Sequence, residues 1–97
     1  MIAAFHLEKD SYLSVSVLAK NRRVKVVVSS DASVNVALFS TSAFNDYTTK
    51  GEANAVWSRK NRHLIEDIVN LPAPGEYVFV IENCGSDALG GTWEIYE

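Results

Sequence analysis

The sequence predicts an all-β protein, a single antiparallel β-sandwich of the jelly-roll type with about seven to eight strands. Three observations predict this fold. Apolar residues recur with a period of two, Val, Ile, Tyr and Phe fill those positions, and turn-forming residues separate the segments. The 97 residues are close to the usual size of one domain with one core, so residues 1–97 are expected to form a single unit.

The strands expected from this alternation follow one another at short spacing. They cover residues 4–7, 12–19, 23–29, 34–39, 77–82 and 92–96. Turns are expected between them, at 20–22 and 30–33 among others. At residues 73–76, Pro74 and Gly75 occupy the two positions that a type II turn requires.

Residues 63–70 fit two patterns. Their apolar residues, at helical spacing, are Leu64, Ile65, Ile68 and Val69. In a strand, Ile65 and Val69 would share one face with Asp67, unless a β-bulge at residues 66–67 shifted the alternation. We predict a strand with that bulge, because a lone helix fits poorly between β-neighbours in so small a sandwich.

The stretch after residue 40 is polar but contains Phe44 and Tyr47, and we expect it to be a loop. Two interpretations of these aromatic residues are open. They could fold back and plug one end of the sandwich, since aromatic side chains bury large areas in small cores. They could instead line a recognition surface, since loops on a rigid sandwich often carry binding residues.

Two segments of this chain resemble a known family. Phe44, Tyr47 and Gly51 form an F-x-x-Y-x-x-x-G pattern, and "LPAPGEYVFVIEN" places a Pro-Gly turn before a strand that ends in Asn83. Together they resemble small bacterial β-sandwich domains of unknown function, some of which are attached to Toll/interleukin-receptor-type domains. They are also similar to the wider jelly-roll class that includes prepeptidase C-terminal domains.

The resemblance covers residues 34–51 and 71–83. It implies a β-sandwich and an accessory or sensing module rather than a catalyst, and it transfers no catalytic residue. The chain departs from that group after Gly51, where we expect a long loop that holds Trp57 and a basic cluster.

Charge is distributed unevenly along the chain, although the net charge is only -3. Basic residues gather at 20–25 and 59–62, and no Lys or Arg follows Arg62, whereas several Asp and Glu do. This pattern is typical either of an ordinary solvated surface or of a protein with a specific partner. It argues against non-specific nucleic-acid binding, which favours a basic domain.

The types of residue and the motifs in this sequence do not indicate an enzyme. The only histidines are His6 and His63, the only cysteine is Cys84, and no catalytic or nucleotide-binding motif is present. No His or Cys pair has the spacing of a zinc site, and no segment matches a defined calcium loop. We therefore expect no catalytic residue, no metal and no cofactor, although a weak calcium site in the loops stays open.

Candidate binding residues lie in two places. The first, in "VWSRKNRH", consists of Trp57, Arg59, Lys60 and Arg62, and the second consists of Phe44 and Tyr47. Trp and Arg are enriched at binding hot spots, so we expect a non-enzymatic module that acts through an unknown protein partner and can self-associate. The alternative is a ligand-binding sandwich, for single-stranded nucleic acid through Trp57 or for sugar through Trp57, Tyr47 and Tyr12.

The expected location is the cytoplasm. A lone Cys84 cannot form an intrachain disulfide, and small secreted domains usually contain disulfides. The first ten residues lack the pattern of a signal peptide, and no apolar run has the length of a membrane span.

Overall fold

A computed structural model describes residues 2–50 and 54–97. Within these residues the elements are β1 (Ala3–Leu7), β2 (Tyr12–Ala19), β3 (Arg23–Ser40), α1 (Thr41–Lys50), β4 (Trp57–Asn70), β5 (Gly75–Glu82) and β6 (Leu89–Tyr96). All strand pairs are antiparallel. The all-β, antiparallel prediction is confirmed, but the described residues form six strands rather than seven to eight.

The structure has fewer strands than predicted because two predicted strands are joined in β3. The polar residues 30–33, expected as a turn, instead form a bend inside one continuous strand, so the segments 23–29 and 34–39 are a single element. The pairing with β4 is irregular there, between Ser29 and Val36, and Asn61 of β4 takes a positive φ of 56°. A strand that bends in this way can pair with different neighbours on either side of the bend.

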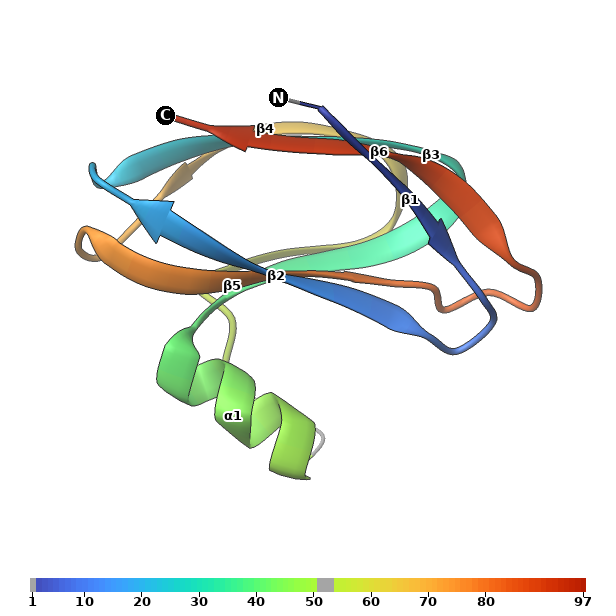
Figure 1. Cartoon of the computed structure of the whole chain (residues 1–97), viewed down its shortest axis with the longest axis horizontal. Coiled ribbons are helices and arrows are strands. Elements are labelled where there is room, and N and C mark those ends of the chain that lie inside the picture. The colour runs from blue at the N-terminus through green and yellow to red at the C-terminus, as the bar shows by residue number, and fades with distance from the viewer. Residues whose placement is uncertain (1, 51–53) are drawn as a thin grey trace.

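The sheet curls around that bend. Residues 25–30 of β3 pair with β6, whereas residues 35–40 pair with β5. The strand order β1-β6-β3-β5-β2 therefore closes into two facing halves, with β4 beside β3 along both (Figure 1). We call these the β6 half and the β5 half. Because one continuous sheet forms both, the finer prediction of a jelly-roll sandwich is not confirmed.

Residues 63–70 are a strand, as predicted, but the expected bulge at residues 66–67 is wrong. Val26 pairs with Asp67 and Val27 with Glu66 without interruption. Asp67 therefore stays on the inward face with Ile65, where it is only half-buried. It can remain there because Arg59 and Trp57 supply polar partners, as described below.

The core fills the space between the two halves. Its fully buried members include Val26, Val28, Leu38, Phe79 and Ile81. These are the residues that the alternation placed inward, and each contributes about 1.5–3 kcal/mol by leaving water. Trp93 of β6 closes the layer by packing on Phe79, with ring centroids 5.6 Å apart.

The segment expected as a loop after residue 40 is a helix, so that prediction is wrong. Its start is capped, because Ser40 Oγ accepts a hydrogen bond from the Ala43 N–H at 3.3 Å. Helical spacing then places Ala43, Phe44 and Tyr47 on one face. That face packs outside the β5 half, where a second apolar cluster contains Phe39, Val78 and Val80 (Figure 1).

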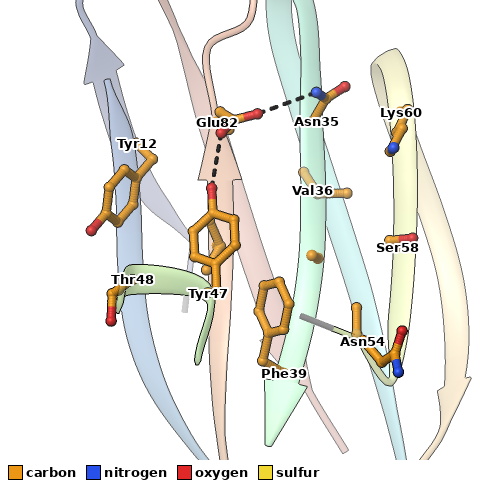
Figure 2. A pocket seen from close by; sticks show the side chains of 13 residues that line it. Tyr12, Asn35, Val36, Phe39, Tyr47, Thr48, Asn54, Ser58, Lys60 and Glu82 are labelled. Carbon is orange, nitrogen blue, oxygen red and sulfur yellow. Dashed lines mark hydrogen bonds between the residues drawn. The ribbon is translucent and has the colours of Figure 1, made fainter. Parts of the chain in front are cut away.

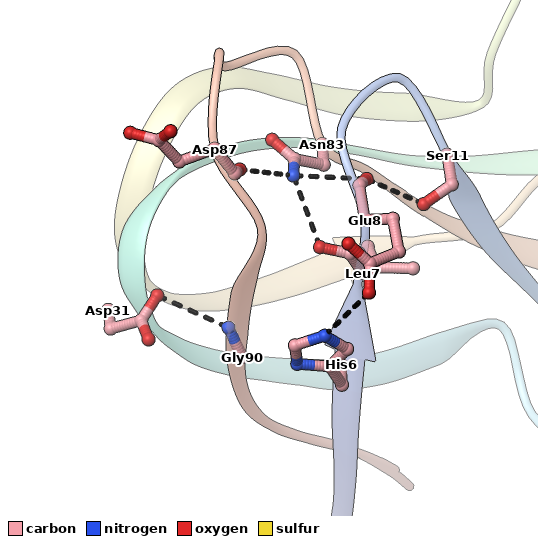
Figure 3. A network of polar contacts seen from close by, with 8 residues as sticks. All are labelled: His6, Leu7, Glu8, Ser11, Asp31, Asn83, Asp87 and Gly90. Carbon is pink, nitrogen blue, oxygen red and sulfur yellow. Dashed lines mark hydrogen bonds and ion pairs between the residues drawn. The ribbon is translucent and has the colours of Figure 1, made fainter.

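A buried amide ties together the loops at one end of the sheet. Asn83 Nδ2 donates to the carbonyl oxygens of Leu7, Glu8 and Asp87, and Asn83 Oδ1 accepts from the Gly85 N–H (Figure 3). The β1–β2 turn and the β5–β6 connection are thereby held side by side. This amide has a structural role, because all of its contacts are to backbone.

Candidate functional site

A groove of about 780 Å³ lies on the outer face of the β5 half, between α1 and the start of β4 (Figure 2). Its lining comprises Tyr12, Asn35, Val36, Ala37, Phe39, Tyr47, Thr48, Asn54, Ala55, Ser58, Lys60, Val80 and Glu82. The volume falls within the range of small-molecule and cofactor sites, about 300–1,000 Å³. It arises because α1 covers only part of the outer face.

One wall of the groove is aromatic. The rings of Tyr12 and Tyr47 meet edge to face, with centroids 6.2 Å apart and planes at 84°. The Tyr47 ring also packs on the rings of Phe39 and Phe44, with centroid distances of 5.2 Å and 6.2 Å, and this packing holds it in place. Tyr12 is 46% exposed, and it can therefore contact a bound molecule.

A polar row runs beside this wall. Glu82 accepts hydrogen bonds from the Tyr47 hydroxyl at 2.9 Å and from Asn35 Nδ2 at 3.3 Å (Figure 2). Asn35 Oδ1 in turn accepts from the Asn61 N–H at 3.0 Å. Burial, with the hydrogen bond to Glu82 second, raises the pKa of Tyr47 to about 12, so the phenol stays protonated at neutral pH. The hydrogen bonds thus fix the geometry of the row.

The opposite wall comes from β4 and the residues before it. Asn54, Ser58 and Lys60 are exposed there and supply an amide, a hydroxyl and an ammonium group. In Figure 2, Lys60 and Glu82 stand on different sides of Val36. A bound molecule would therefore meet an aromatic, acidic wall on one side and a polar, basic wall on the other.

The predicted site residues do not form one site. Tyr47 and Lys60 line the groove, whereas Phe44 lies beneath α1 in the second apolar cluster. Arg62 is exposed on β4 and does not line the groove. The predicted stacking surface of Trp57 is absent, because this side chain is 8% exposed and belongs to the core.

The expected loop around Trp57 and the basic cluster is wrong, because these residues belong to the strand β4. The Arg59 side chain is bound by residues of this same strand. It binds Asp67 at 2.8 Å, and its guanidinium lies 5.3 Å from the Trp57 ring centroid. Trp57 Nε1 also donates to Asp67 at 3.3 Å. Because β4 bends near Asn61, residues ten positions apart become neighbours, and their polar atoms satisfy one another rather than a partner.

Asn35, Ser58 and Glu82 were not predicted as site residues. They occupy outward positions of strands, where a polar side chain is the default, so the sequence carried no separate signal for them. Tyr12 was predicted only within the sugar alternative. Among residues 2–50 and 54–97, no group of three His, Cys, Asp or Glu side chains could hold a metal ion. No helix in the same residues is long and apolar enough to cross a membrane.

No protein-family model and no curated protein matches this chain. Solved structures do resemble it. One is PliG of Aeromonas hydrophila, a periplasmic inhibitor of g-type lysozyme, with a TM-score of 0.71 and 16% identity over 99% of this chain and 83% of that one. Another is the Yersinia pseudotuberculosis-derived mitogen, with a TM-score of 0.66 and 8% identity over 99% and 85%. A designed double-stranded β-helix has a TM-score of 0.61 and 5% identity over 98% and 97%. At these identities the likeness shows the fold alone.

The predicted cytoplasmic location is wrong on this comparison, because the fold of this chain also forms a periplasmic protein, PliG. The lone Cys84 was a poor guide to the compartment, since the core between the two halves closes without a disulfide. The resemblance to Toll/interleukin-receptor-attached and prepeptidase C-terminal domains is not tested by these structures and stays a prediction.

Proposed function

We propose that this chain is a non-enzymatic binding module that acts on a partner protein through the groove between α1 and β4. The observation that supports this most is the fixed Tyr47–Glu82–Asn35 row beside the exposed Tyr12 ring. Binding sites combine an apolar floor with a few polar groups at set positions. Ala37, Phe39 and Val80 supply that floor here.

Two of the similar folds also support a binding role. PliG is described as a lysozyme inhibitor and the Yersinia protein as a mitogen, and both names describe an action on another protein or cell. The first partner to test is a g-type lysozyme, because PliG inhibits that enzyme. A periplasmic location is part of the proposal and can be checked by fractionating the native host.

The test is a substitution that fills the groove with a large side chain and leaves the core residues unchanged. Ser58 is exposed and lines the groove, so Ser58→Trp places an indole in it. Thr92→Trp is the matched control, because Thr92 is exposed on the outer face of the other half. Binding to g-type lysozyme, and to proteins captured from host lysate, is measured by calorimetry for the wild type and both variants.

We expect Ser58→Trp to abolish binding and Thr92→Trp to retain it. Binding that survives Ser58→Trp in a folded protein would move the contact away from the groove. A folded wild type that binds no protein in either experiment would end the protein-partner proposal.

A second candidate function is sugar binding in the same groove. Tyr12 and Tyr47 offer ring faces for stacking, while Glu82 and Asn35 offer hydrogen-bonding atoms. A glycan array probed with the wild type and with Tyr12→Ala separates the two candidates. Glycan binding that is lost in Tyr12→Ala favours the sugar, and the absence of any glycan signal leaves the protein partner.

A further inference from the structure

β4 has a long edge that no other strand covers. It pairs with β3 on one side, and in residues 2–50 and 54–97 no strand pairs with its other side. The strand runs for 14 residues, from Trp57 to Asn70, and contains no proline. Such an edge presents unpaired backbone N–H and C=O groups, which can pair with a strand of another chain.

The outward side chains of this edge follow a specific order. Arg62, Leu64, Glu66 and Ile68 alternate with the inward residues, and all four are exposed, Leu64 by 63% and Ile68 by 60%. The strand is regular from Leu64 to Asn70, where each residue has one partner on β3. Leu64, Glu66 and Ile68 therefore stand at equal spacing on one face. Arg62 is exposed two residues before Leu64, beyond a register shift in the pairing with β3.

This order is complementary to itself. In an antiparallel pair, residues directly opposite each other point to the same face. If Leu64 of one copy lies opposite Leu64 of another, Arg62 of each copy lies opposite Glu66 of the other. Moving the two-fold axis to Glu66 or to Arg62 would oppose like charges. An axis one residue before Leu64 would oppose Glu66 to Lys60, but Asn61, which has a positive φ of 56°, interrupts the extended backbone between Lys60 and Arg62.

We propose that two copies of this chain associate through β4, antiparallel about a two-fold axis at Leu64, with Arg62 of each copy paired to Glu66 of the other. Glu66 already binds Lys25 at 2.9 Å, so its carboxylate would lie between two cations. The contact is isologous, and it closes after two copies rather than forming a filament. Because the contact joins only one edge strand of each copy, we expect the association to be reversible and dependent on concentration.

The first experiment uses charge reversal and sedimentation equilibrium up to near-millimolar concentration. In Arg62→Glu and in Glu66→Arg the two charged positions on β4 carry the same sign, so self-association should weaken on the order of tenfold or more. An equimolar mixture of the two variants should associate again, because both cross-strand contacts of the mixed dimer then join opposite charges. That recovery is specific to this register.

The second experiment tests the axis itself. Leu64→Lys brings two ammonium groups together at the centre of the interface and should leave a monomer. Leu18→Lys is the matched control, since Leu18 is a leucine exposed by 71% on β2, and it should associate like the wild type. Circular dichroism checks that all variants are folded, which is expected because each changed side chain is exposed.

A wild type that stays monomeric at near-millimolar concentration would overturn the proposal. So would a dimer that Arg62→Glu and Leu64→Lys leave intact, because its interface would lie elsewhere. The proposal is independent of groove binding, since the oligomeric state is measured on the chain alone and Ser58→Trp tests the groove against a partner.

Discussion

Asn83 provides the sharpest test of how this fold is held together. It is the buried polar residue of the described chain, with 1% exposure. Its Nδ2 lies 3.2 Å from Leu7 O, 3.1 Å from Glu8 O and 2.8 Å from Asp87 O. An amide NH₂ has two hydrogens, so three carbonyl oxygens share two donors. Removing those donors should leave buried acceptors without partners.

The substitution Asn83→Asp keeps the size and shape but replaces the donor with an acceptor. Two donated hydrogen bonds are lost at about 1 kcal/mol each, and a buried negative charge then faces carbonyl oxygens, so the total cost should be about 3–5 kcal/mol. That is a large part of the roughly 5–15 kcal/mol by which small domains are stable. Asn83→Ala, which introduces no charge, should cost less, about 2–3 kcal/mol.

Urea unfolding followed by circular dichroism measures both variants against the wild type. The carbonyl oxygens should raise the pKa of the carboxyl group introduced by Asn83→Asp above its ordinary value of about 3.9. Stability should therefore fall as pH rises from mildly acidic to neutral, and the deficit against the wild type should shrink in acid. The reasoning is refuted if Asn83→Asp at neutral pH unfolds within about 1 kcal/mol of the wild type.

Three further predictions concern single positions. Gly91→Ala would place a Cβ against the carbonyl oxygen of Ser29, so β6 must shift on β3. Urea unfolding should show that the free energy of unfolding falls by about 3 kcal/mol or more. A decrease under about 1 kcal/mol would contradict this close approach. The pKa of Tyr47 is raised from 10.0 to about 12 in the fold, so its contribution to the free energy of unfolding is present below pH 10.0 and is lost as pH rises to about 12. Tyr47→Phe should therefore flatten the alkaline decline in stability that unfolding experiments measure in that window. A decline that is unchanged in Tyr47→Phe would contradict this prediction. Asp67→Asn removes one charge of the 2.8 Å pair with Arg59 and should cost about 1 kcal/mol in the same assay, whereas a neutral result would mean that the pair adds no stability.

The strands could be predicted from the sequence because their side chains alternate. In β2 the alternation of Leu13, Val15 and Val17 with serines corresponds to the half-buried and exposed pattern of the structure. The joining of two predicted strands into β3 could not be predicted in the same way. Ser30–Asp31–Ala32–Ser33 has turn composition, and only the pairing with β4 and β6 on both sides keeps it extended.

The helix was missed because its composition is weak. Thr, Ser, Asn and Asp favour caps and turns over helix interiors, and they fill most of residues 41–46. What stabilises α1 is tertiary packing of Phe44 and Tyr47 on Phe39. Tyr47 was predicted as a binding residue, and it lines the groove, but the surface that it shares with Glu82 and Asn35 depends on that packing.

The burial of Trp57 has a related cause. A Trp next to Arg residues resembles a binding hot spot in a linear sequence, but β4 bends and brings Asp67 beside both Trp57 and Arg59. A carboxylate on the inward face of a strand needs a cation or a donor close by. Asp67, which conflicted with the predicted alternation, was therefore the available sign that an inward partner existed.

The two halves of the sheet differ in a way that the sequence already expresses. β5 reads as an uninterrupted apolar run from Tyr77 to Ile81, which is typical of a strand buried on both faces. Such a strand requires a cover, and the segment that supplies aromatic side chains for it is residues 41–50. The β6 half alternates instead, and its outward positions on β4 remain exposed. Covering one half by a short helix leaves the groove beside that helix, whereas the exposed edge of β4 in the other half is available to a second copy.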